Sequence, residues 1–386
     1  MRVADWVVGI AFLLLLYHWV LYPALIHILA GFAPRRSVTT AMETPKVSIL
    51  IPAYNEEITI AAKIRNSFQL DYPRSSLEVI VGSDASSDGT DAIVTSFDAD
   101  RVRLVRIPSR GGYSVVMNQL AAAATGELLL CTDADVLLAP GSVRDLASIF
   151  SDPDVGIACV RYERLGKHGH RGENLYDRYE SWIKGNESRM GVMVGAYGAG
   201  IMMRKECWAE MPTDTILADM WMSTTVLARG LRVVQVHAAR AVGPTEDPSG
   251  EFRRKTRIGR GSLQVFLRRP LSYAPWSGLR GWVMFSHKGL RLLLPWLMLA
   301  MLAGSAVGAF HSVYHRILLA GQLGVWLTSP LPILPGARRL RWLLAPQYLT
   351  LMTIALGLGA VQHVLKPSRG VPERTPRTAG WDAPDQ

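Results

Sequence analysis

Short apolar runs and stretches of helical spacing alternate between Lys46 and Thr132, and this alternation constrains the fold more than any other feature. Each apolar run has the length of a β-strand, and the stretches between the runs carry apolar residues at helical spacing. Strands that alternate with helices predict βαβ units and a mostly parallel sheet. We therefore expect an α/β, Rossmann-like domain here. The expected strands are 46–52, one that begins the stretch 77–90 and ends near Asp84, 101–109 and 127–132, and the expected helices are 58–69, 113–125 and one beginning near Asp88.

Polar side chains stand at the carboxyl ends of three of these expected strands. Tyr54–Glu56 follow the first strand, Asp84 ends the second, and Asp133 and Asp135 follow the fourth. In parallel α/β sheets, ligands bind outside the carboxyl ends of the strands. Three separate strands that deliver acids to one edge therefore predict a ligand site at that edge.

Asp133 and Asp135 are two carboxylates separated by one small residue, directly after an apolar run. In an extended or turning backbone both can face one divalent cation, directly or through water. Hard oxygen ligands favour Mg²⁺ or Mn²⁺, and Mg²⁺ is usually shared between one or two carboxylates and substrate phosphates. The alternative is a pair of turn or helix-cap aspartates, which are common in loops.

The two ends of the chain are apolar, whereas charged residues crowd the middle. Trp6–Phe32 is an almost uncharged run that is long enough to cross a membrane, and it lacks the short apolar region and cleavage site of a signal peptide. We expect a retained membrane anchor, with a buried core helix as the alternative. Further spans are expected at about 289–310, 316–334 and 342–364.

The formal net charge is +10, and many basic residues stand beside the expected spans. Such short basic flanks mark the cytoplasmic side, so we expect a multi-pass protein of the inner or plasma membrane with its middle domain in the cytoplasm. We find no zinc-finger or RNA-binding signature and expect no nucleic-acid partner. The flanking basic residues are Arg35, Arg36, Lys288, Arg291, Arg338, Arg339 and Arg341.

Six motifs follow one another along the middle of the chain: IPAYNEE, VGSDASSDGT, CTDADVLL, GAYGAGIMMRKE, LADMWMS and FRRKTRIGRG. In this order they resemble a family 2 glycosyltransferase with the nucleotide-sugar (GT-A) fold. The resemblance covers roughly residues 46–270. The flanking apolar runs are arranged as in the membrane-integrated members, which include the polysaccharide, cellulose and hyaluronan synthase-like enzymes.

The resemblance implies a role for each matched residue. Asp219 would be the general base that takes the proton of the acceptor hydroxyl. Asp135 would bind the metal ion, Mg²⁺ or Mn²⁺, and Asp133 would contact the metal and the sugar-phosphate side of the donor. The residues implied to bind the nucleotide-diphosphate sugar, for which UDP is favoured, are Pro52, Ala53, Tyr54, Glu56, Asp84, Asp133 and Arg257.

Asp219 is a lone carboxylate among apolar residues. The alternative to a catalytic role is that Asp219 caps the helix expected to follow it. Trp221, two residues further on, would stack on a sugar acceptor beside this acid. The alternative for Trp221 is a place in the core.

Two stretches depart from the pattern of the processive members, which carry Gln-x-x-Arg-Trp near the end of the domain. Arg254, Arg257 and Ile258 occupy those places, so only the arginine is kept. Arg257 would clamp a diphosphate with its planar donor fork, and the alternative is a basic face resting on anionic lipid. Tyr113 stands where related sequences commonly have lysine, and Arg110 would substitute for that cation.

We therefore expect an inverting, metal-dependent glycosyltransferase that builds a surface or extracellular polysaccharide, with export partner subunits. The first alternative is transfer of a single sugar to a lipid-linked acceptor or glycolipid. The second is a non-catalytic membrane partner with a decayed domain. The expected divisions are an anchor at 1–45, the GT-A domain at 46–270, an interfacial segment with three spans at 271–366 and a flexible tail at 367–386.

Overall fold

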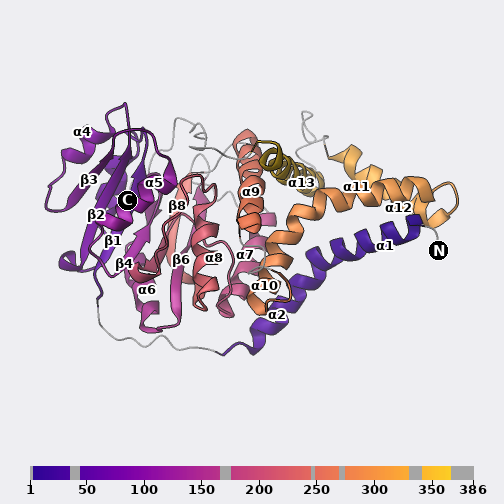
Figure 1. The fold of residues 1–386 in the computed structure, drawn as a ribbon, viewed down its shortest axis with the longest axis horizontal. Coiled ribbons are helices and arrows are strands. Elements are labelled where there is room, and N and C mark those ends of the chain that lie inside the picture. The colour runs from indigo at the N-terminus through magenta and orange to yellow at the C-terminus, as the bar shows by residue number, and fades with distance from the viewer. Residues whose placement is uncertain are drawn as a thin grey trace. The chain divides into compact units, whose positions relative to one another are not determined.

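The structure is a computed structural model, and it describes residues 3–34, 44–165, 175–244, 248–268, 274–329 and 341–366. The predicted tail at 367–386 and the basic flanks Arg35, Arg36, Arg338 and Arg339 lie outside these ranges. The chain forms two compact units (Figure 1). We call the unit of Leu29–Glu246 and Ser368–Gln386 the sheet unit, and the unit of Met1–Ile28 and Asp247–Pro367 the helical unit.

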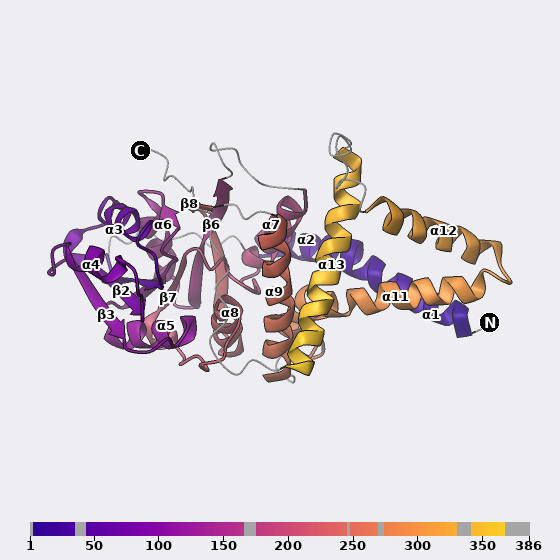
Figure 2. The ribbon, with the colours of Figure 1, turned by 90° about the horizontal axis from the view of Figure 1, so that it is seen from above.

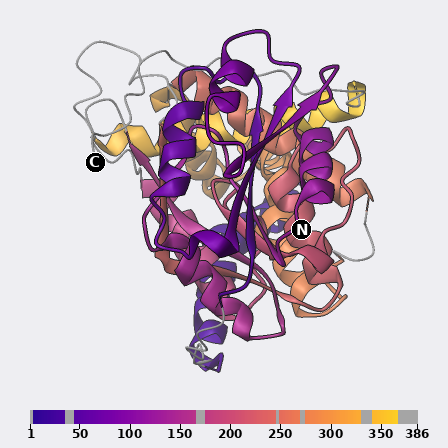
Figure 3. The ribbon, with the colours of Figure 1, turned by 90° about the vertical axis from the view of Figure 1, so that its left-hand side faces the viewer.

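The sheet unit is built on an eight-stranded mixed sheet of order β3-β2-β1-β4-β7-β6-β8-β5, and its β3 edge faces the viewer in Figure 3. β1, β2, β3 and β4 pair in parallel, as the alternation of strands and helices predicts. β7 runs antiparallel between β4 and β6. The strands are β1 (Val47–Ala53), β2 (Leu77–Asp84), β3 (Val102–Ile107), β4 (Leu128–Cys131), β5 (Leu137–Leu138), β6 (Val155–Leu165), β7 (Ile201–Arg204) and β8 (Arg232–Pro244).

Helices cover both faces of this sheet, with α3 and α6 on one face and α5 and α8 on the other (Figure 2). The side chains of β1 alternate accordingly: Ile49 and Ile51 join the core cluster that includes Ile60 and Ile64 of α3. The helices are α3 (Ile60–Phe68), α4 (Thr90–Thr95), α5 (Tyr113–Ala123), α6 (Ser142–Ser148), α7 (Leu175–Arg189) and α8 (Ala218–Ala228), with 3₁₀ turns at Arg74–Ser76, Ile149–Ser151 and Lys205–Cys207.

Among the described residues, two helical stretches of 30 residues are long and apolar enough to cross a membrane. One is Leu279–Gly308 of the helical unit, and the other is Val3–Phe32, which belongs to that unit as far as Ile28. A π-helical turn interrupts each stretch, and Tyr17 Oη and Ser286 Oγ join the two turns at 2.7 Å. The elements are α1 (Val3–Leu16), η1 (Tyr17–Leu21), α2 (Tyr22–Phe32), α9 (Pro248–Arg268), α10 (Leu279–Met284), η7 (Phe285–Gly289), α11 (Leu290–Gly308), α12 (Val313–Thr328) and α13 (Arg341–Leu365).

The predicted spans at 316–334 and 342–364 stay predictions. α12 has 16 residues, which gives a length of about 24 Å against roughly 30 Å of hydrocarbon. In α13 the apolar stretch within the described residues is Thr350–Leu365. α9 packs against α13 at very short range, because a Cβ built on Gly259 would lie 2.3 Å from the carbonyl oxygen of Leu356.

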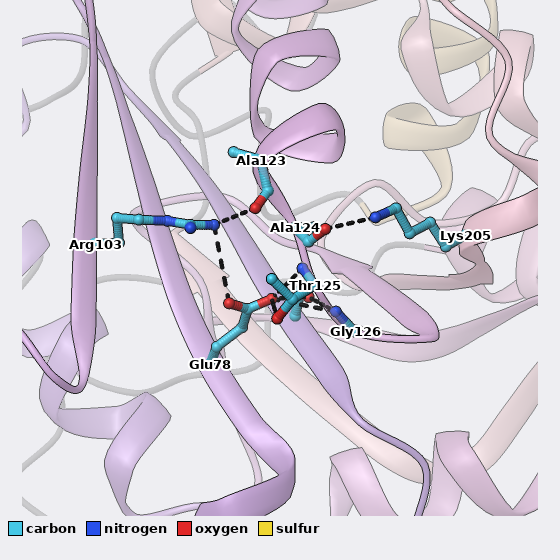
Figure 4. A network of polar contacts seen from close by, with 8 residues as sticks. Glu78, Arg103, Ala123, Ala124, Thr125, Gly126 and Lys205 are labelled. Atoms are coloured by element: carbon cyan, nitrogen blue, oxygen red, sulfur yellow. Dashed lines mark hydrogen bonds and ion pairs between the residues drawn. The ribbon is translucent and has the colours of Figure 1, made fainter.

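The amino ends of β1, β2 and β4 lie opposite the polar clusters. They are held together by one carboxylate, Glu78 of β2 (Figure 4). Its Oε1 accepts hydrogen bonds from the Ser48 hydroxyl, the Thr125 backbone N–H (2.6 Å) and the Gly126 backbone N–H (3.2 Å). A Cβ on Gly126 would lie 2.7 Å from the Ser48 backbone nitrogen, so the chain passes too close for a side chain here. Glu78 therefore ties the turn before β4 to β1 and β2.

Replacing Glu78 by alanine removes the acceptor of the Ser48 hydroxyl and of the Thr125 backbone N–H, so we expect a loss of about 2 kcal/mol and an apparent Tm lower by about 4–8 °C. Burial raises the pKa of Glu78, but the hydrogen bonds from Ser48 and Thr125, with Arg103 nearby, lower it overall below its usual 4.5. The folded state therefore binds this proton less readily than the unfolded chain. The stabilisation is present above pH 4.5 and is lost as the pH falls through the lower folded pKa.

The measurement is thermal unfolding of the full-length protein in detergent across this pH range. The control is Glu210→Ala, an exposed acid for which the structure gives no hydrogen bond. An equal Tm for Glu78→Ala and the unmutated protein at neutral pH would contradict the assignment.

Candidate active site

The loop after β1 and the loop after β2 are joined by hydrogen bonds at the carboxyl edge of the sheet. Asn55 Oδ1 accepts a hydrogen bond from the Ser87 backbone N–H at 2.8 Å, and the Glu56 backbone N–H donates to Thr90 Oγ1 at 2.7 Å. Asn55 and Ala85 both adopt a φ of 55°, a left-handed conformation that is uncommon for residues other than glycine. The two predicted polar clusters thus lie side by side.

Asp84 ends β2 and is almost fully buried, with 4 % of its surface exposed. Its Oδ1 accepts a hydrogen bond from the Gly111 backbone N–H at 2.7 Å, and its Oδ2 accepts one from Gly112 at 2.9 Å. Gly112 has a φ of 82°, which favours glycine. Asp84 therefore holds the glycine loop before α5, while its predicted contact with the donor base stays a prediction.

Arg110, next to this glycine loop, lies over the aromatic ring of Tyr54. Its guanidinium carbon is 3.5 Å from the ring centroid, at the range of a cation–π contact. A cation from the loop before α5 thus contacts a residue predicted to bind the nucleotide. The idea that Arg110 substitutes for the lysine absent at position 113 stays a prediction.

Asp133 and Asp135 lie in a turn after β4, closed by a hydrogen bond from the Val136 backbone N–H to the Asp133 carbonyl oxygen (3.3 Å). Both acids are partly exposed, whereas the alternate residues Ala134 and Val136 are each 2 % exposed. The acids therefore share the exposed side of the turn. We call residues 132–136 the acid turn.

Two carboxylates on one exposed turn fit a hard cation such as Mg²⁺ or Mn²⁺ that completes its shell with water and phosphate oxygens. Within the described ranges, no group of three or more His, Cys, Asp and Glu side chains could hold a metal ion by itself. The donor set thus suits a cation that arrives with a phosphorylated substrate, and a fully protein-ligated structural site is absent from these ranges.

Lys63 of α3 is a residue that sequence reasoning missed. Its side chain is completely buried, and Nζ donates hydrogen bonds to Thr132 Oγ1 (2.9 Å) and the Val136 carbonyl oxygen (2.6 Å). Burial lowers the pKa of Lys63 to about 7, although the charges of Asp133 and Asp135 oppose this shift. The signal in the sequence was a lysine beside the apolar helical positions Ile60 and Ile64.

Asp219 lies in the first turn of α8 and is partly exposed. The N-cap residue of this helix is Leu217, so Asp219 does not occupy the cap position considered above. Its Oδ1 nevertheless accepts a hydrogen bond from the Met220 backbone N–H at 2.8 Å. In the described part of the chain no hydrogen bond reaches Oδ2, which leaves that oxygen available to take a proton.

The first turn of α5 brings the acid turn and α8 together. Burial raises the pKa of the Tyr113 hydroxyl well above its usual value, and the negative charges of Asp133 and Asp219 raise it further. Both acids therefore lie within electrostatic range of one phenol. Asn118 of α5 also exchanges two hydrogen bonds with the backbone of Met211, at 2.9 and 3.0 Å, which fixes the segment before α8 against α5.

A second buried cation lies near Asp219. Lys184 of α7 places Nζ 3.9 Å from the ring centroid of Tyr197, and Tyr197 Oη shares a hydrogen bond with Ser181 Oγ at 3.2 Å. Burial lowers the pKa of Lys184, but Tyr197, Glu180 and Asp219 raise it overall. Sequence reasoning missed this pair, although Tyr197 stands in the GAYGAG motif.

The remaining predicted residues differ in how the structure presents them. Pro52 and Ala53 end β1 at the carboxyl edge. Trp221 is only 8 % exposed, which does not favour stacking on an acceptor and favours the alternative, a place in the core. Arg257 is exposed on α9 of the helical unit, so its role stays a prediction.

Asp84→Asn should loosen the glycine loop, because an amide offers only one acceptor oxygen to the two donors Gly111 and Gly112. Hydrogen bonds to charged groups contribute about 1.5–3 kcal/mol, so we expect deuterium uptake by a peptide spanning 108–114 to quicken at least about tenfold. Hydrogen-exchange mass spectrometry measures it, with the exposed Asp100→Asn as the control. Unchanged uptake in Asp84→Asn would show that the loop does not depend on this carboxylate.

Residues 48–209 match the model of the family described as glycosyl transferase family 2. The chain is 30% identical over 192 residues to a beta-monoglucosyldiacylglycerol synthase of Trichormus variabilis, covering 46% of this chain and 40% of the synthase. It is 25% identical over 233 residues to an N-acetylglucosaminyltransferase of Rhizobium leguminosarum bv. viciae, covering 55% of this chain and 54% of that protein. The chain thus spans about half or less of the length of these relatives.

Among solved structures, the chain is similar to the mannosyltransferase PcManGT from Pyrobaculum calidifontis, solved in complex with GDP-Man and Mn²⁺. The TM-score is 0.70 at 23% sequence identity, covering 94% of this chain and 99% of that one. At this identity the likeness concerns the fold, and it confirms the predicted α/β architecture. The chain therefore carries a glycosyl transferase family 2 domain with the GT-A fold.

Proposed function

We propose that this protein transfers a sugar from a nucleoside-diphosphate donor to an acceptor hydroxyl, with inversion at the sugar carbon and with the help of a divalent cation. One observation carries the proposal: Thr132 of the acid turn donates to the Ala199 carbonyl oxygen at 2.8 Å, and a Cβ built on the preceding residue, Gly198, would lie 3.8 Å from Asp219 Cβ. A pair of metal-type carboxylates and a separate carboxylate with an unbonded oxygen therefore share one site. Such a site provides for a leaving diphosphate and for a proton acceptor.

The donor nucleotide would lie against the loops after β1 and β2. Tyr54 carries the Arg110 guanidinium over its ring, and Asp84 fixes the glycine loop that carries Arg110. Glu56 is 6 % exposed and accepts a hydrogen bond from Thr59 Oγ1 at 3.0 Å. It would therefore support the loop after β1 from its buried side. We favour UDP as the nucleotide.

Asp135 and Asp133 would hold Mg²⁺ or Mn²⁺. When bound, the cation neutralises negative charge that develops on the diphosphate as the glycosidic bond to the nucleotide breaks. The similarity to a mannosyltransferase solved with GDP-Man and Mn²⁺ supports this proposal, as does the exposed side that the two acids share.

Asp219 would act as the general base. Its Oδ2 would accept the proton of the acceptor hydroxyl while its Oδ1 stays hydrogen-bonded to the Met220 backbone N–H, which keeps the carboxylate oriented. The acceptor oxygen then attacks the sugar carbon from the face opposite the departing diphosphate. One base and a single displacement give inversion.

We propose transfer of a single sugar to a lipid-linked acceptor or glycolipid as the favoured reaction, with polysaccharide synthesis as the second candidate. Similarity to a beta-monoglucosyldiacylglycerol synthase supports the first. The departures at Arg254 and Ile258 from the processive pattern point the same way. Polysaccharide synthesis and export partners would require the further spans that the sequence predicts.

The helical unit supports a membrane location. Val3–Phe32 and Leu279–Gly308 each give a helix of about 45 Å, and large apolar side chains such as Ile10, Leu13 and Trp296 are exposed on them. We propose that these two stretches cross the inner or plasma membrane and that the sheet unit works in the cytoplasm, where nucleotide sugars are made.

The central test uses Asp219→Asn and Asp135→Ala in membrane vesicles with a panel of UDP- and GDP-sugars. Asp219→Asn keeps the side-chain shape but removes the base, so kcat should fall by about 10²–10⁴-fold with donor binding retained. Asp135→Ala should weaken Mn²⁺-dependent donor binding at least about tenfold, as expected when metal coordination is disturbed. Release of nucleoside diphosphate measures turnover.

Glu210→Gln is the control, because Glu210 is an exposed acid that lies outside both the acid turn and α8. Equal turnover by Asp219→Asn and the unmutated protein would remove the assignment of the base. No turnover by the unmutated protein with any donor would favour the non-catalytic partner. Product mass then separates the two acceptor classes, because a product always one sugar longer than its acceptor ends the polysaccharide hypothesis.

A further inference from the structure

A buried ammonium group holds both ends of the acid turn. Lys63 Nζ donates to Thr132 Oγ1 at 2.9 Å and to the Val136 carbonyl oxygen at 2.6 Å. These two acceptors belong to the residues directly before Asp133 and directly after Asp135. A single side chain therefore spans the loop that carries both carboxylates, from the side that solvent does not reach.

The same helix holds the chain just beyond the turn. Asn66, one helical turn after Lys63, donates from Nδ2 to the Leu138 carbonyl oxygen and accepts from the Leu138 backbone N–H, both at 2.9 Å. Asn66 is 4 % exposed. α3 thus fixes residues 132–138 at three backbone or side-chain positions, and only the two acids and Ala139 of the stretch 132–139 remain partly exposed.

Thr132 passes this constraint on to the loop beside Asp219. Its hydroxyl accepts from Lys63 and donates to the Ala199 carbonyl oxygen at 2.8 Å. The next residue back, Gly198, lies against Asp219, because a Cβ built on it would be 3.8 Å from Asp219 Cβ. A continuous chain of contacts therefore runs from Lys63 through Thr132 to the backbone beside the proposed base.

We propose that Lys63 is a positioning residue for the transfer reaction, setting the acid turn to receive the cation and donor and fixing it relative to the loop beside Asp219. The inference rests on the proposed function. Lys63 does not touch substrate, because its side chain is fully buried. Its effect passes through the backbone on which Asp133 and Asp135 stand.

A purely structural explanation fits the same position less well. An apolar side chain of similar length would fill the space without removing a charge from water, a replacement that is often neutral or stabilising. Burial of Lys63 instead opposes its charge strongly enough to bring its pKa near neutrality. What only the ammonium provides is a donor that reaches both flanks of the turn.

The test compares Lys63→Met, Thr132→Val and Ser67→Ala in the full-length protein. Lys63→Met keeps the length but removes the donors, and Thr132→Val removes the hydroxyl that relays them. Ser67 is the matched control, because it is equally buried on α3 and its hydroxyl, among the residues that the structure describes, bonds only the Lys63 carbonyl oxygen, at 3.0 Å. The readout is the Kd for Mn²⁺ in the presence of UDP or GDP. It is measured from the electron paramagnetic resonance signal of free Mn²⁺.

If Lys63 positions the acid turn, Lys63→Met should weaken Mn²⁺ binding. If Lys63 acts only through its charge, Lys63→Met should strengthen it. Losing a nearby positive charge would by itself strengthen cation binding, whereas losing the support of the turn weakens it. We expect the Kd for Mn²⁺ to rise about tenfold or more, as when outer-sphere partners of metal ligands are removed. Thr132→Val should shift it in the same direction by a smaller factor, and Ser67→Ala should leave it unchanged.

Thermal unfolding identifies variants that fail to fold. If Lys63→Met does not fold, the result for Thr132→Val decides the test. Unchanged or tighter Mn²⁺ binding in the folded variants would overturn the role of Lys63 while leaving the proposed function intact. Failure of the unmutated protein to bind Mn²⁺ with either nucleotide would overturn both. A parallel loss in Ser67→Ala would overturn the positioning role by showing a general effect of changes in α3.

Discussion

The parallel pairing of β1 with both β2 and β4 is the constraint on which the site depends. It sets Val47 opposite Leu77 on one side and opposite Leu128 on the other, so all three strands run the same way in one register. Their carboxyl ends therefore open on one edge. The loop after β1, the Asp84 carboxylate and the acid turn meet there because the sheet brings them there. The opposite edge is closed by Glu78, whose hydrogen bonds gather β1, β2 and the turn before β4.

The sequence predicted this half of the fold well, because each strand has its own apolar run and each of the first three strands is followed by a helix. The strand expected within 77–90, ending near Asp84, is β2, and the expected helix at 113–125 differs from α5 by two residues at its end. β4 is one residue shorter at each end than expected. Local pattern sufficed here because parallel βαβ units are themselves local.

The second half of the sheet could not be read in the same way. β7 runs antiparallel between β4 and β6, and β8 pairs with β6 across a register shift, so its neighbours are distant in sequence. Such pairings are long-range contacts that no local periodicity encodes.

The same limit applies to Lys63 and Lys184, because a single lysine in a helical stretch gives no sign of the loop against which it will be buried. For Trp221 the prediction of an acceptor contact rested on its closeness to Asp219 in the sequence. Asp219 is partly exposed, but the Trp221 side chain is buried.

The site is electrostatically balanced by the protein itself on its buried side. Asp133 and Asp219 lie within electrostatic range of Tyr113, and Asp133 and Asp135 lie within electrostatic range of Lys63. Like charges that gather in this way repel. Lys63 and Lys184 lie behind them, each held in place by its own contacts. Their charges offset part of the repulsion within the fold. Asp133 and Asp135 share the partly exposed side of the acid turn, and that side is where we propose that a divalent ion binds together with the diphosphate.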